Sequence, residues 1–132
     1  MALLTKCIFG PKEVGDGFRV SIMSRHTLND GTTPDSRITP DCYDAHHVVL
    51  APSPQLLGDY YKRGLSWNEF EKRFRAEIAR PEAVNLIRMF AELALTQNIT
   101  LLCGEEMPYL CHRRIIAEEC KRLIPELVVI LN

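Results

Sequence analysis

The sequence has no apolar run near the roughly 18 residues that a helix needs to cross a bilayer, so we expect no membrane-spanning segment. Its first residues show neither a basic stretch nor a cleavage motif, and we therefore expect no signal peptide and a cytoplasmic protein. Glycine and proline are few, 7 and 8 in 132 residues, and 46% of the residues are hydrophobic. This composition excludes collagen-like and disordered chains and fits one domain over residues 1–132.

A charge excess of either sign is also absent. Lys and Arg number 16 and Asp and Glu 17, which gives a formal net charge of −1. Proteins that coat nucleic acid are usually clearly basic. The charge balance therefore disfavours a general nucleic-acid partner.

Motifs with a fixed spacing are missing too. The chain has no GxxxxGK[ST] or GxGxxG loop for nucleotides and no C-x-x-C redox pair. The phosphate loop of tyrosine phosphatases needs an arginine six residues after its cysteine, but Tyr109 and Ala117 stand at those places after Cys103 and Cys111. The five cysteines are Cys7, Cys42, Cys103, Cys111 and Cys120. Their odd number suits a reducing compartment, and none of their spacings is that of a close zinc-binding pair.

The hydrophobic pattern predicts five strands and four helices. The strands are expected at 3–9, 18–23, 48–50 (with His46 as an alternative start), 99–103 and 127–131. The helices are expected at about 54–63, 67–78, 81–98 and 112–123. Ser53-Pro54 and the capping box from Ser66 to Glu69 mark two helix starts, and Gly64 marks a helix end. The polar segment 24–44 has no clear periodicity, and a loop of this length tends to be functional or mobile.

The order of these elements predicts the fold class. Residues 99–131 read as strand, helix and strand with tight connections, which is a parallel unit with a right-handed crossover. Continuous apolar strands suit a sheet that is covered on both faces. We predict one three-layer α/β domain, with a mostly parallel sheet of about four or five strands flanked by helices.

Ligands of open parallel sheets bind beyond the carboxyl ends of the strands, so the segments there are the candidates for a site. Residues 103–114 follow the fourth expected strand and hold two thiols, two carboxylates, one imidazole and two guanidinium groups. Ser24, Arg25 and His26 follow the second expected strand. If the two strands are parallel, both segments face one cleft with the long loop over it.

The most informative of these residues is Cys111, at the start of the last helix. The helix dipole, with Arg113, Arg114 and a protonated His112, would lower the pKa of its thiol, and the same place would hold a small anionic ligand. The alternative is a partly buried small residue beside a solvated helix face.

Cys103, at the end of an apolar strand, is either a core cysteine or a partner of Cys111, with which a reversible disulfide is conceivable. Glu105 and Glu106 are candidate general acids or bases, although surface turns commonly carry such a pair.

Other residues receive a structural interpretation. Cys7 and Cys120 fall on apolar patterns and are expected in the core, whereas Cys42 lies in the loop. His46-His47 precede the third expected strand, so we place them at the edge opposite the site. A zinc site from Cys103, Cys111, His112 and His26 would lack a local chelating pair, and we expect no metal and no cofactor.

Four segments resemble the family of domain of unknown function 488. They are GDGFRV (15–20), WNEFEKRF (67–74), LLCGEE (101–106) and CHRRIIAE (111–118), and the Cys-His-Arg block is the most specific. The resemblance implies a small α/β protein without an established activity, with enzymatic or nucleic-acid-related roles suggested for its paired cysteines. The signature positions that it implies are Cys103, Glu105, Cys111, His112 and Arg113. The stretch after Met23 departs from many members.

Three functions remain open. The first is a thiol-dependent enzyme or redox protein with Cys111 as the activated thiol, Cys103 as its partner and Glu105 or His112 as the proton carrier. Its expected ligand-binding residues are Ser24, Arg25, His26 and Arg113. The second is a nucleotide or nucleic-acid binding module that contacts phosphates through Arg113, Arg114, Lys121 and Arg122. The third is a structural or assembly protein with incidental cysteines.

Overall fold

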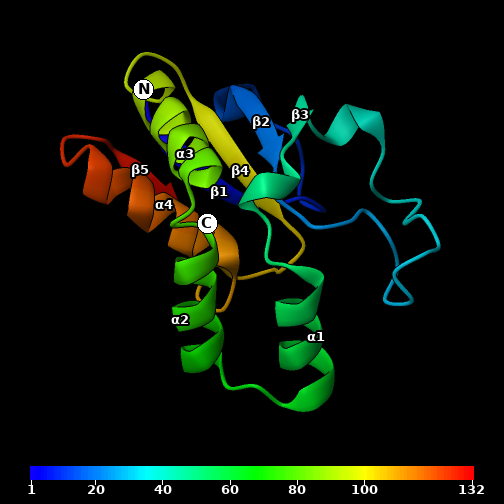
Figure 1. Ribbon diagram of the computed structural model, residues 1–132. Coiled ribbons are helices and arrows are strands. Elements are labelled where there is room, and N and C mark those ends of the chain that lie inside the picture. The colour runs from blue at the N-terminus through cyan, green and yellow to red at the C-terminus, as the bar shows by residue number, and fades with distance from the viewer.

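The computed structural model describes residues 1–132 as a five-stranded, all-parallel sheet with four α-helices (Figure 1). The strands, in the spatial order β3-β2-β4-β1-β5, are β1 (Leu3–Cys7), β2 (Phe18–Ser21), β3 (Ala45–His46), β4 (Ile99–Cys103) and β5 (Val129–Leu131). The helices are α1 (Pro54–Arg63), α2 (Trp67–Glu77), α3 (Pro81–Leu93) and α4 (His112–Leu123). The prediction of an α/β domain with a parallel sheet is confirmed. None of the helices has both the length and the apolar character that crossing a membrane requires.

The helices begin where their capping residues are. The hydroxyl oxygen of Ser53 accepts a hydrogen bond from the Leu56 N–H, and that of Ser66 accepts one from the Glu69 N–H. Gly64 ends α1 in the left-handed region with a φ of 74°, which favours glycine. The expected starts of α1 and α2 and the end of α1 are therefore confirmed.

The hydrophobic core lies on one face of the sheet. Leu3, Ile99 and Leu101 alternate along their strands toward α3 and α4, and all three are fully buried. The apolar faces of the helices complete this core, with Ala83, Ile87, Phe90, Ala91, Ile115, Ile116 and Cys120 among its members. The α-helices that pack on the sheet thus cover this face, and the segment between β1 and β2 covers the other.

The second face carries a buried ionic cluster under the segment between β1 and β2. Asp16, in the 3₁₀-helix η1 (Val14–Asp16), is 1% exposed and forms ion pairs with Lys6 from β1 and Arg19 from β2. The Thr100 hydroxyl in β4 donates to the Asp16 backbone oxygen at 2.7 Å. Burial alone would raise the pKa of Asp16, but the hydrogen bonds from Lys6, the Glu13 backbone and Arg19 lower it below the usual value. Asp16 therefore connects the three neighbouring strands β1, β4 and β2 through charged and polar side chains.

Several strand boundaries differ from the prediction. Residues 48–50 form the 3₁₀-helix η3 rather than a strand, and the third strand is Ala45–His46. The last ladder bond there runs from the His47 N–H to the Ser21 oxygen, after which the Leu50 N–H turns back to the His47 oxygen. β1 ends at Cys7 and β2 at Ser21, earlier than expected. α3 ends at Leu93 because the following N–H groups form tighter turns.

The helical hairpin of α1 and α2 lies at the carboxyl edge of the sheet (Figure 1). The segment 24–44 extends beside β3 instead, away from this hairpin (Figure 1). Asp35 orders that segment, because its buried carboxylate accepts hydrogen bonds from the Arg37 backbone and guanidinium. The expected long loop therefore exists, but helices rather than this loop adjoin the carboxyl end of β4.

The ionic cluster gives a test of the second face. Replacing Asp16 with Asn leaves the buried Arg19 guanidinium without its carboxylate, and we expect the free energy of unfolding to fall by about 3 kcal/mol. Urea unfolding at pH 7 measures this, with the exposed Asp41→Asn variant as a control expected to change stability by less than about 0.5 kcal/mol.

The stability that the Asp16→Asn substitution removes depends on pH. Because the pKa of Asp16 is lowered on folding, its stabilisation is complete above the unfolded-state pKa of about 3.9 and is lost as the pH falls through the lower folded-state pKa. The difference in stability between the wild type and Asp16→Asn should shrink only below about pH 4. A difference that is already small at pH 7 would contradict the role of Asp16.

Candidate functional site

The end of β4 and the start of α4 bring two thiols and one imidazole together. The sulfur atoms of Cys103 and Cys111 and a ring nitrogen of His112 all lie within 4.8 Å of one another. All three residues are buried, with exposed fractions of 6%, 2% and 7%. Cys103 lies two residues after the core residue Leu101 and therefore on the same, helical face of the sheet, which places it against α4.

His112 is held in one orientation by two contacts. Its Nε2 atom lies 2.6 Å from the backbone oxygen of Ile22, and the Phe74 ring of α2 meets the imidazole edge-on at 5.5 Å between centroids. A carbonyl oxygen only accepts hydrogen bonds, so Nε2 must carry the proton. In the neutral imidazole, Nδ1 is then the acceptor, and it lies 3.5 Å from the Cys103 sulfur. The fold therefore places a basic nitrogen beside the Cys103 sulfur, with the Cys111 sulfur also within 4.8 Å.

The two thiols have pKa values shifted in opposite directions. The pKa of Cys103 is lowered, first because the Cys111 thiol donates a hydrogen bond to its sulfur. Backbone N–H groups of Glu105 and Gly104 add to this effect, whereas burial opposes it. The pKa of Cys111 is raised, because burial and its hydrogen bond to Cys103 favour the protonated thiol more strongly than the nearby His112 opposes it. The expectation that the helix start activates Cys111 is corrected: desolvation outweighs the helix dipole there, and Cys103 is the thiol that the surroundings favour as an anion.

Arg113 is fully buried and does not face a ligand. Its guanidinium donates to the backbone oxygens of Glu105, Glu106 and Asn132 at 2.6–3.2 Å, and its Nε has no partner. This buried cation lowers the pKa of Cys103 by its charge. Arg113 thus joins the segment after β4 to the end of β5, in place of the exposed anion contact that the sequence suggests.

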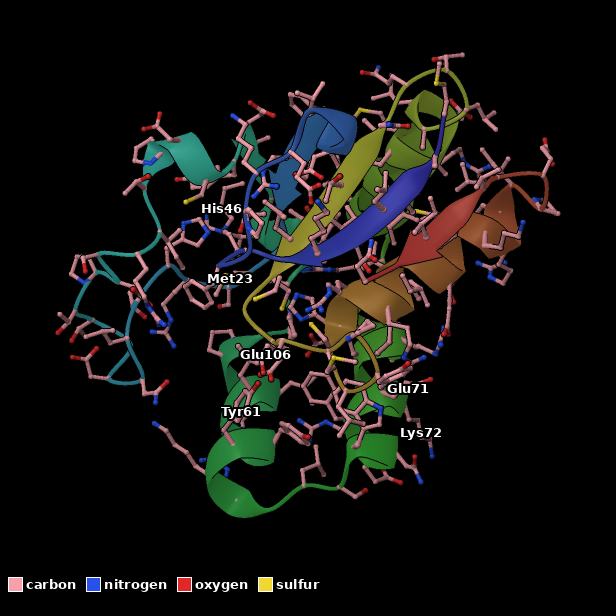
Figure 2. The ribbon with its side chains drawn as sticks, turned by 180° about the vertical axis from the view of Figure 1, so that it is seen from behind. Met23, His46, Tyr61, Glu71, Lys72 and Glu106 are labelled. Atoms are coloured by element: carbon pink, nitrogen blue, oxygen red, sulfur yellow. The ribbon has the colours of Figure 1, made fainter.

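Tyr61 is a residue of this site that sequence reasoning missed. Tyr61 lies on α1, and its hydroxyl donates a hydrogen bond to the Glu105 carboxylate at 2.7 Å. Figure 2 shows Tyr61 beside Glu106, the residue after Glu105, below the sheet edge. Desolvation and this hydrogen bond raise the pKa of Tyr61 above its usual value. Nothing in the sequence distinguishes Tyr61 from Tyr60 on the same helix face; only the fold brings α1 to the segment after β4.

A second cluster of polar residues lies at the carboxyl end of β2. The Ser21 hydroxyl lies 2.7 Å from His26 Nε2, and the His26 ring stacks on His46 with 4.1 Å between centroids. His46 Nε2 donates to the Met23 backbone oxygen at 2.6 Å, and both residues are labelled in Figure 2. Burial and the charge of His46 lower the pKa of His26 to about 4. The prediction that His46 lies at the opposite edge is wrong, because β3 runs parallel to β2 with His46 in register with Ser21.

The two clusters lie on opposite faces of the sheet. Ser21 alternates with Ile22 along β2 and its extension, so its side chain and His26 lie on the face away from Cys103. Arg25 is exposed and donates to the Gly31 oxygen at 3.2 Å, within its own loop. Ser24 is half-buried beside it. The structure therefore does not bring Ser24, Arg25 and His26 to the thiols in one cleft.

The three close donors could hold one thiophilic metal ion. Two sulfurs and one imidazole nitrogen are zinc ligands, but structural zinc sites are closed by four. His26, the fourth donor considered from the sequence, is engaged with Ser21 and His46 instead. The four-ligand site is therefore not assembled.

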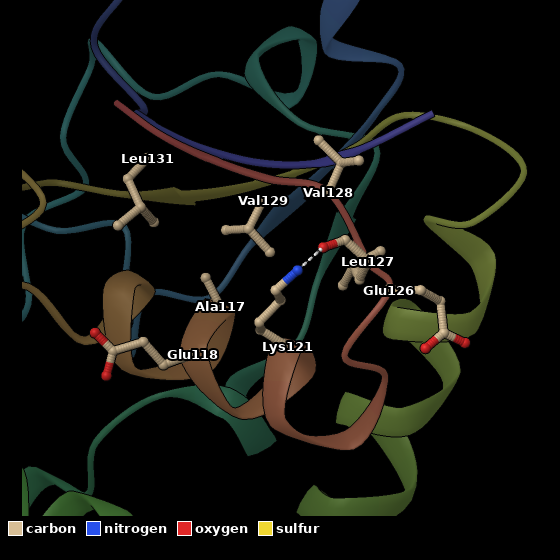
Figure 3. Close-up of a pocket in the computed structure, with 8 residues that line it drawn as sticks. All are labelled: Ala117, Glu118, Lys121, Glu126, Leu127, Val128, Val129 and Leu131. Atoms are coloured by element: carbon tan, nitrogen blue, oxygen red, sulfur yellow. Dashed lines mark hydrogen bonds between the residues drawn. The ribbon is translucent and has the colours of Figure 1, made fainter.

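A shallow pocket of about 420 Å³ opens elsewhere, between α4 and β5 (Figure 3). Lys121 crosses it and donates from Nζ to the Leu127 backbone oxygen at 2.6 Å. None of the thiol-site residues lines this pocket. Its other charged lining residues are Glu118 and Glu126, and the rest of the lining is apolar.

The chain was compared with known families, curated proteins and solved structures. The sequence profile of DUF488-N3a, described as the active DUF488-N3 subclade, matches residues 4–122. No curated protein and no solved structure matches. The match runs from the second residue of β1 to the last but one of α4 and includes the Cys103, Cys111 and His112 cluster. The chain therefore belongs to the DUF488 family of domains of unknown function.

Proposed function

We propose that this protein is a thiol-dependent enzyme in which Cys103 is the nucleophile and His112 its proton acceptor. The observation that carries the proposal is the 3.5 Å contact between the Cys103 sulfur and His112 Nδ1, with the proton of His112 fixed on Nε2 by the Ile22 oxygen. A nucleophile beside a base that a third group orients is the arrangement of covalent catalysis.

The geometry supports a defined first step. The thiol proton of Cys103 passes to His112 Nδ1, and the resulting imidazolium keeps its hydrogen bond to the Ile22 oxygen. The Cys111 thiol and the N–H groups of Glu105 and Gly104 point toward the sulfur and stabilise its negative charge. The thiolate then attacks an electrophilic atom of the substrate.

The surroundings favour a small anionic substrate. Cys103 is only 6% exposed, so a bulky chain has no access to its sulfur without movement of the segment after β4. Positive potential comes from the buried Arg113 and from the N-terminus of α4, which begins beside the two thiols. Glu105, in the segment after β4, is exposed and accepts a hydrogen bond from Tyr61.

The nucleic-acid alternative receives less support from the same contacts. Arg113 is buried, Arg114 is paired with Glu71 and Glu118, and Arg122 is paired with Glu119. Side chains already neutralised by carboxylates release few counterions on meeting phosphates. We therefore keep the enzyme as the proposed function.

The pH dependence of alkylation tests the nucleophile. We expect the rate of Cys103 alkylation by iodoacetamide to reach half of its maximum below the ordinary thiol pKa of about 8.5, because the folded protein lowers the pKa of Cys103. Peptide mass spectrometry over about pH 5 to 10 assigns the rate to this cysteine, with Cys103→Ser as the blank. A half-maximal rate at or above pH 8.5 would remove the basis of the proposal.

The role of His112 is tested by His112→Gln. The glutamine amide can still donate to the Ile22 oxygen, but it offers no basic nitrogen to the sulfur. We expect the alkylation profile to move to higher pH by about one unit, which is about a tenfold lower rate at pH 7. The matched control is His47→Gln, whose ring contacts Phe90 instead of a thiol and whose profile should stay that of the wild type. Equal profiles for His112→Gln and the wild type would show that His112 is not the proton acceptor.

A further inference from the structure

Cys111 is a second thiol beside the proposed nucleophile that the first step uses only as a hydrogen-bond donor. We propose that hydroperoxides are substrates of this site, oxidising Cys103 to a sulfenic acid that Cys111 converts into a Cys103–Cys111 disulfide. This inference rests on the proposed function, because it needs the same Cys103 thiolate. It adds a second, uncharged substrate class beside the small anion of the proposed function, and the disulfide blocks attack by Cys103 on the anion until a dithiol reduces it.

The distance between the two sulfurs permits the disulfide. They lie within 4.8 Å, and the Cys111 thiol donates toward the Cys103 sulfur. A disulfide needs about 2.05 Å between the sulfurs, so the pair must approach by less than about 3 Å. Cys111 precedes the first residue of α4 and follows the segment 104–110, in which most residues are exposed. The approach therefore requires a shift of a surface segment and a side-chain rotation, without displacement of the core.

The two thiols have different roles because their surroundings differ. Cys103, whose pKa is lowered, is the thiolate that attacks the hydroperoxide. Cys111, whose pKa is raised, stays protonated and unreactive until a sulfenic acid forms next to it. This division makes Cys103 the oxidised residue and Cys111 the residue that resolves it.

The steps balance in atoms and electrons. The Cys103 thiolate attacks the terminal oxygen of ROOH, the O–O bond breaks, and the departing alkoxide takes the proton from His112 to leave as ROH. The sulfur is now Cys103–SOH. The Cys111 sulfur then attacks the Cys103 sulfur while its proton passes to His112, and the displaced hydroxide takes that proton and leaves as water. Two thiols have lost two electrons in total, and ROOH has become ROH and water; an external dithiol reverses the oxidation.

The other cysteines are less suited to resolve Cys103. Cys7 is the register neighbour of Cys103 on β1, but its thiol contacts the Gly104 oxygen at 3.7 Å, and it is not a member of the close cluster. Cys120 is fully buried and contacts the Ile87 oxygen, and burial raises its pKa to about 12. Cys42 lies in the loop beside β3 and contacts the Arg37 oxygen. Cys111 is therefore the expected partner.

The experiment maps the disulfide directly. Reduced full-length protein is treated with one equivalent of hydrogen peroxide or tert-butyl hydroperoxide, blocked with iodoacetamide and digested without reductant. Trypsin leaves both cysteines in one peptide, residues 89–113, so a second cleavage after Glu105 or Glu106 is needed to separate them. We expect the two pieces to remain joined until dithiothreitol is added. We also expect Cys103 alkylation to fall at least tenfold after oxidation and to recover on reduction.

Two variants separate the steps. In Cys111→Ser, the sulfenic acid has no resolving thiol, and dimedone should label Cys103. In Cys103→Ser, neither a disulfide at Cys111 nor a dimedone adduct should form. Cys42→Ser is the matched control and should behave as the wild type.

The outcomes distinguish this inference from the function on which it rests. The inference is overturned if Cys103 of the wild type alkylates with a midpoint below pH 8.5 but, after hydroperoxide treatment, stays reduced, pairs with Cys7 or is oxidised directly to sulfinic acid. Each of these results leaves the proposed nucleophile intact. A Cys103 with ordinary alkylation overturns the proposed function itself. Folding of each variant is checked by its thermal unfolding, so that loss of structure is not taken for loss of reactivity.

Discussion

The site depends on one hydrogen bond, from His112 Nε2 to the backbone oxygen of Ile22. Ile22 is the first residue after β2, and its own N–H still bonds to the Leu102 oxygen of β4. Its oxygen points to the same side as that N–H, toward β4, but no further N–H of β4 bonds to it, because β4 ends at Cys103. An unpaired carbonyl at a sheet edge therefore orients an imidazole from a helix that begins 90 residues later, and that imidazole in turn faces Cys103.

The extension of β2 contacts three imidazoles in succession. His26 meets the Ser21 hydroxyl, His112 the Ile22 oxygen and His46 the Met23 oxygen, in each case through Nε2. Strand alternation places the Ser21 contact on one face of the sheet and the thiol cluster on the other. The ionic cluster around Asp16 also lies on the face away from the helices, where it fixes the strands from which both clusters project. The carboxyl edge thus has two polar clusters that share a backbone segment but not a cleft.

Much of the fold could be predicted from the sequence because its signals are local. The serine caps, Gly64 and the apolar periodicity gave the four helices, and the strand–helix–strand pattern of residues 99–131 gave the parallel sheet. The position of the third strand could not be predicted, because Val48, Val49 and Leu50 have high strand propensity, yet the chain turns there into the core. Propensity does not encode which residue forms the last ladder bond.

The candidate site could be predicted in part. The hydrophobic pattern of the sequence places Cys103 at the end of a buried strand and Cys111 and His112 at the start of the next helix. The roles of Ile22, Phe74 and Tyr61 could not be predicted, because each contacts the site from a distant part of the sequence. The burial of Arg113 could not be predicted either, because an arginine near a helix start is usually solvated. The three carbonyl oxygens that accept its hydrogen bonds come from two separate segments. Because β2, α2, β4 and α4 must all be in place before His112 faces the sulfur, the ionisation of a single side chain reports on the assembly of the whole tertiary structure. A partly unfolded chain would keep Cys103 and Cys111 but lose the difference between the pKa values of their thiols. This difference is therefore itself a signature of the native state.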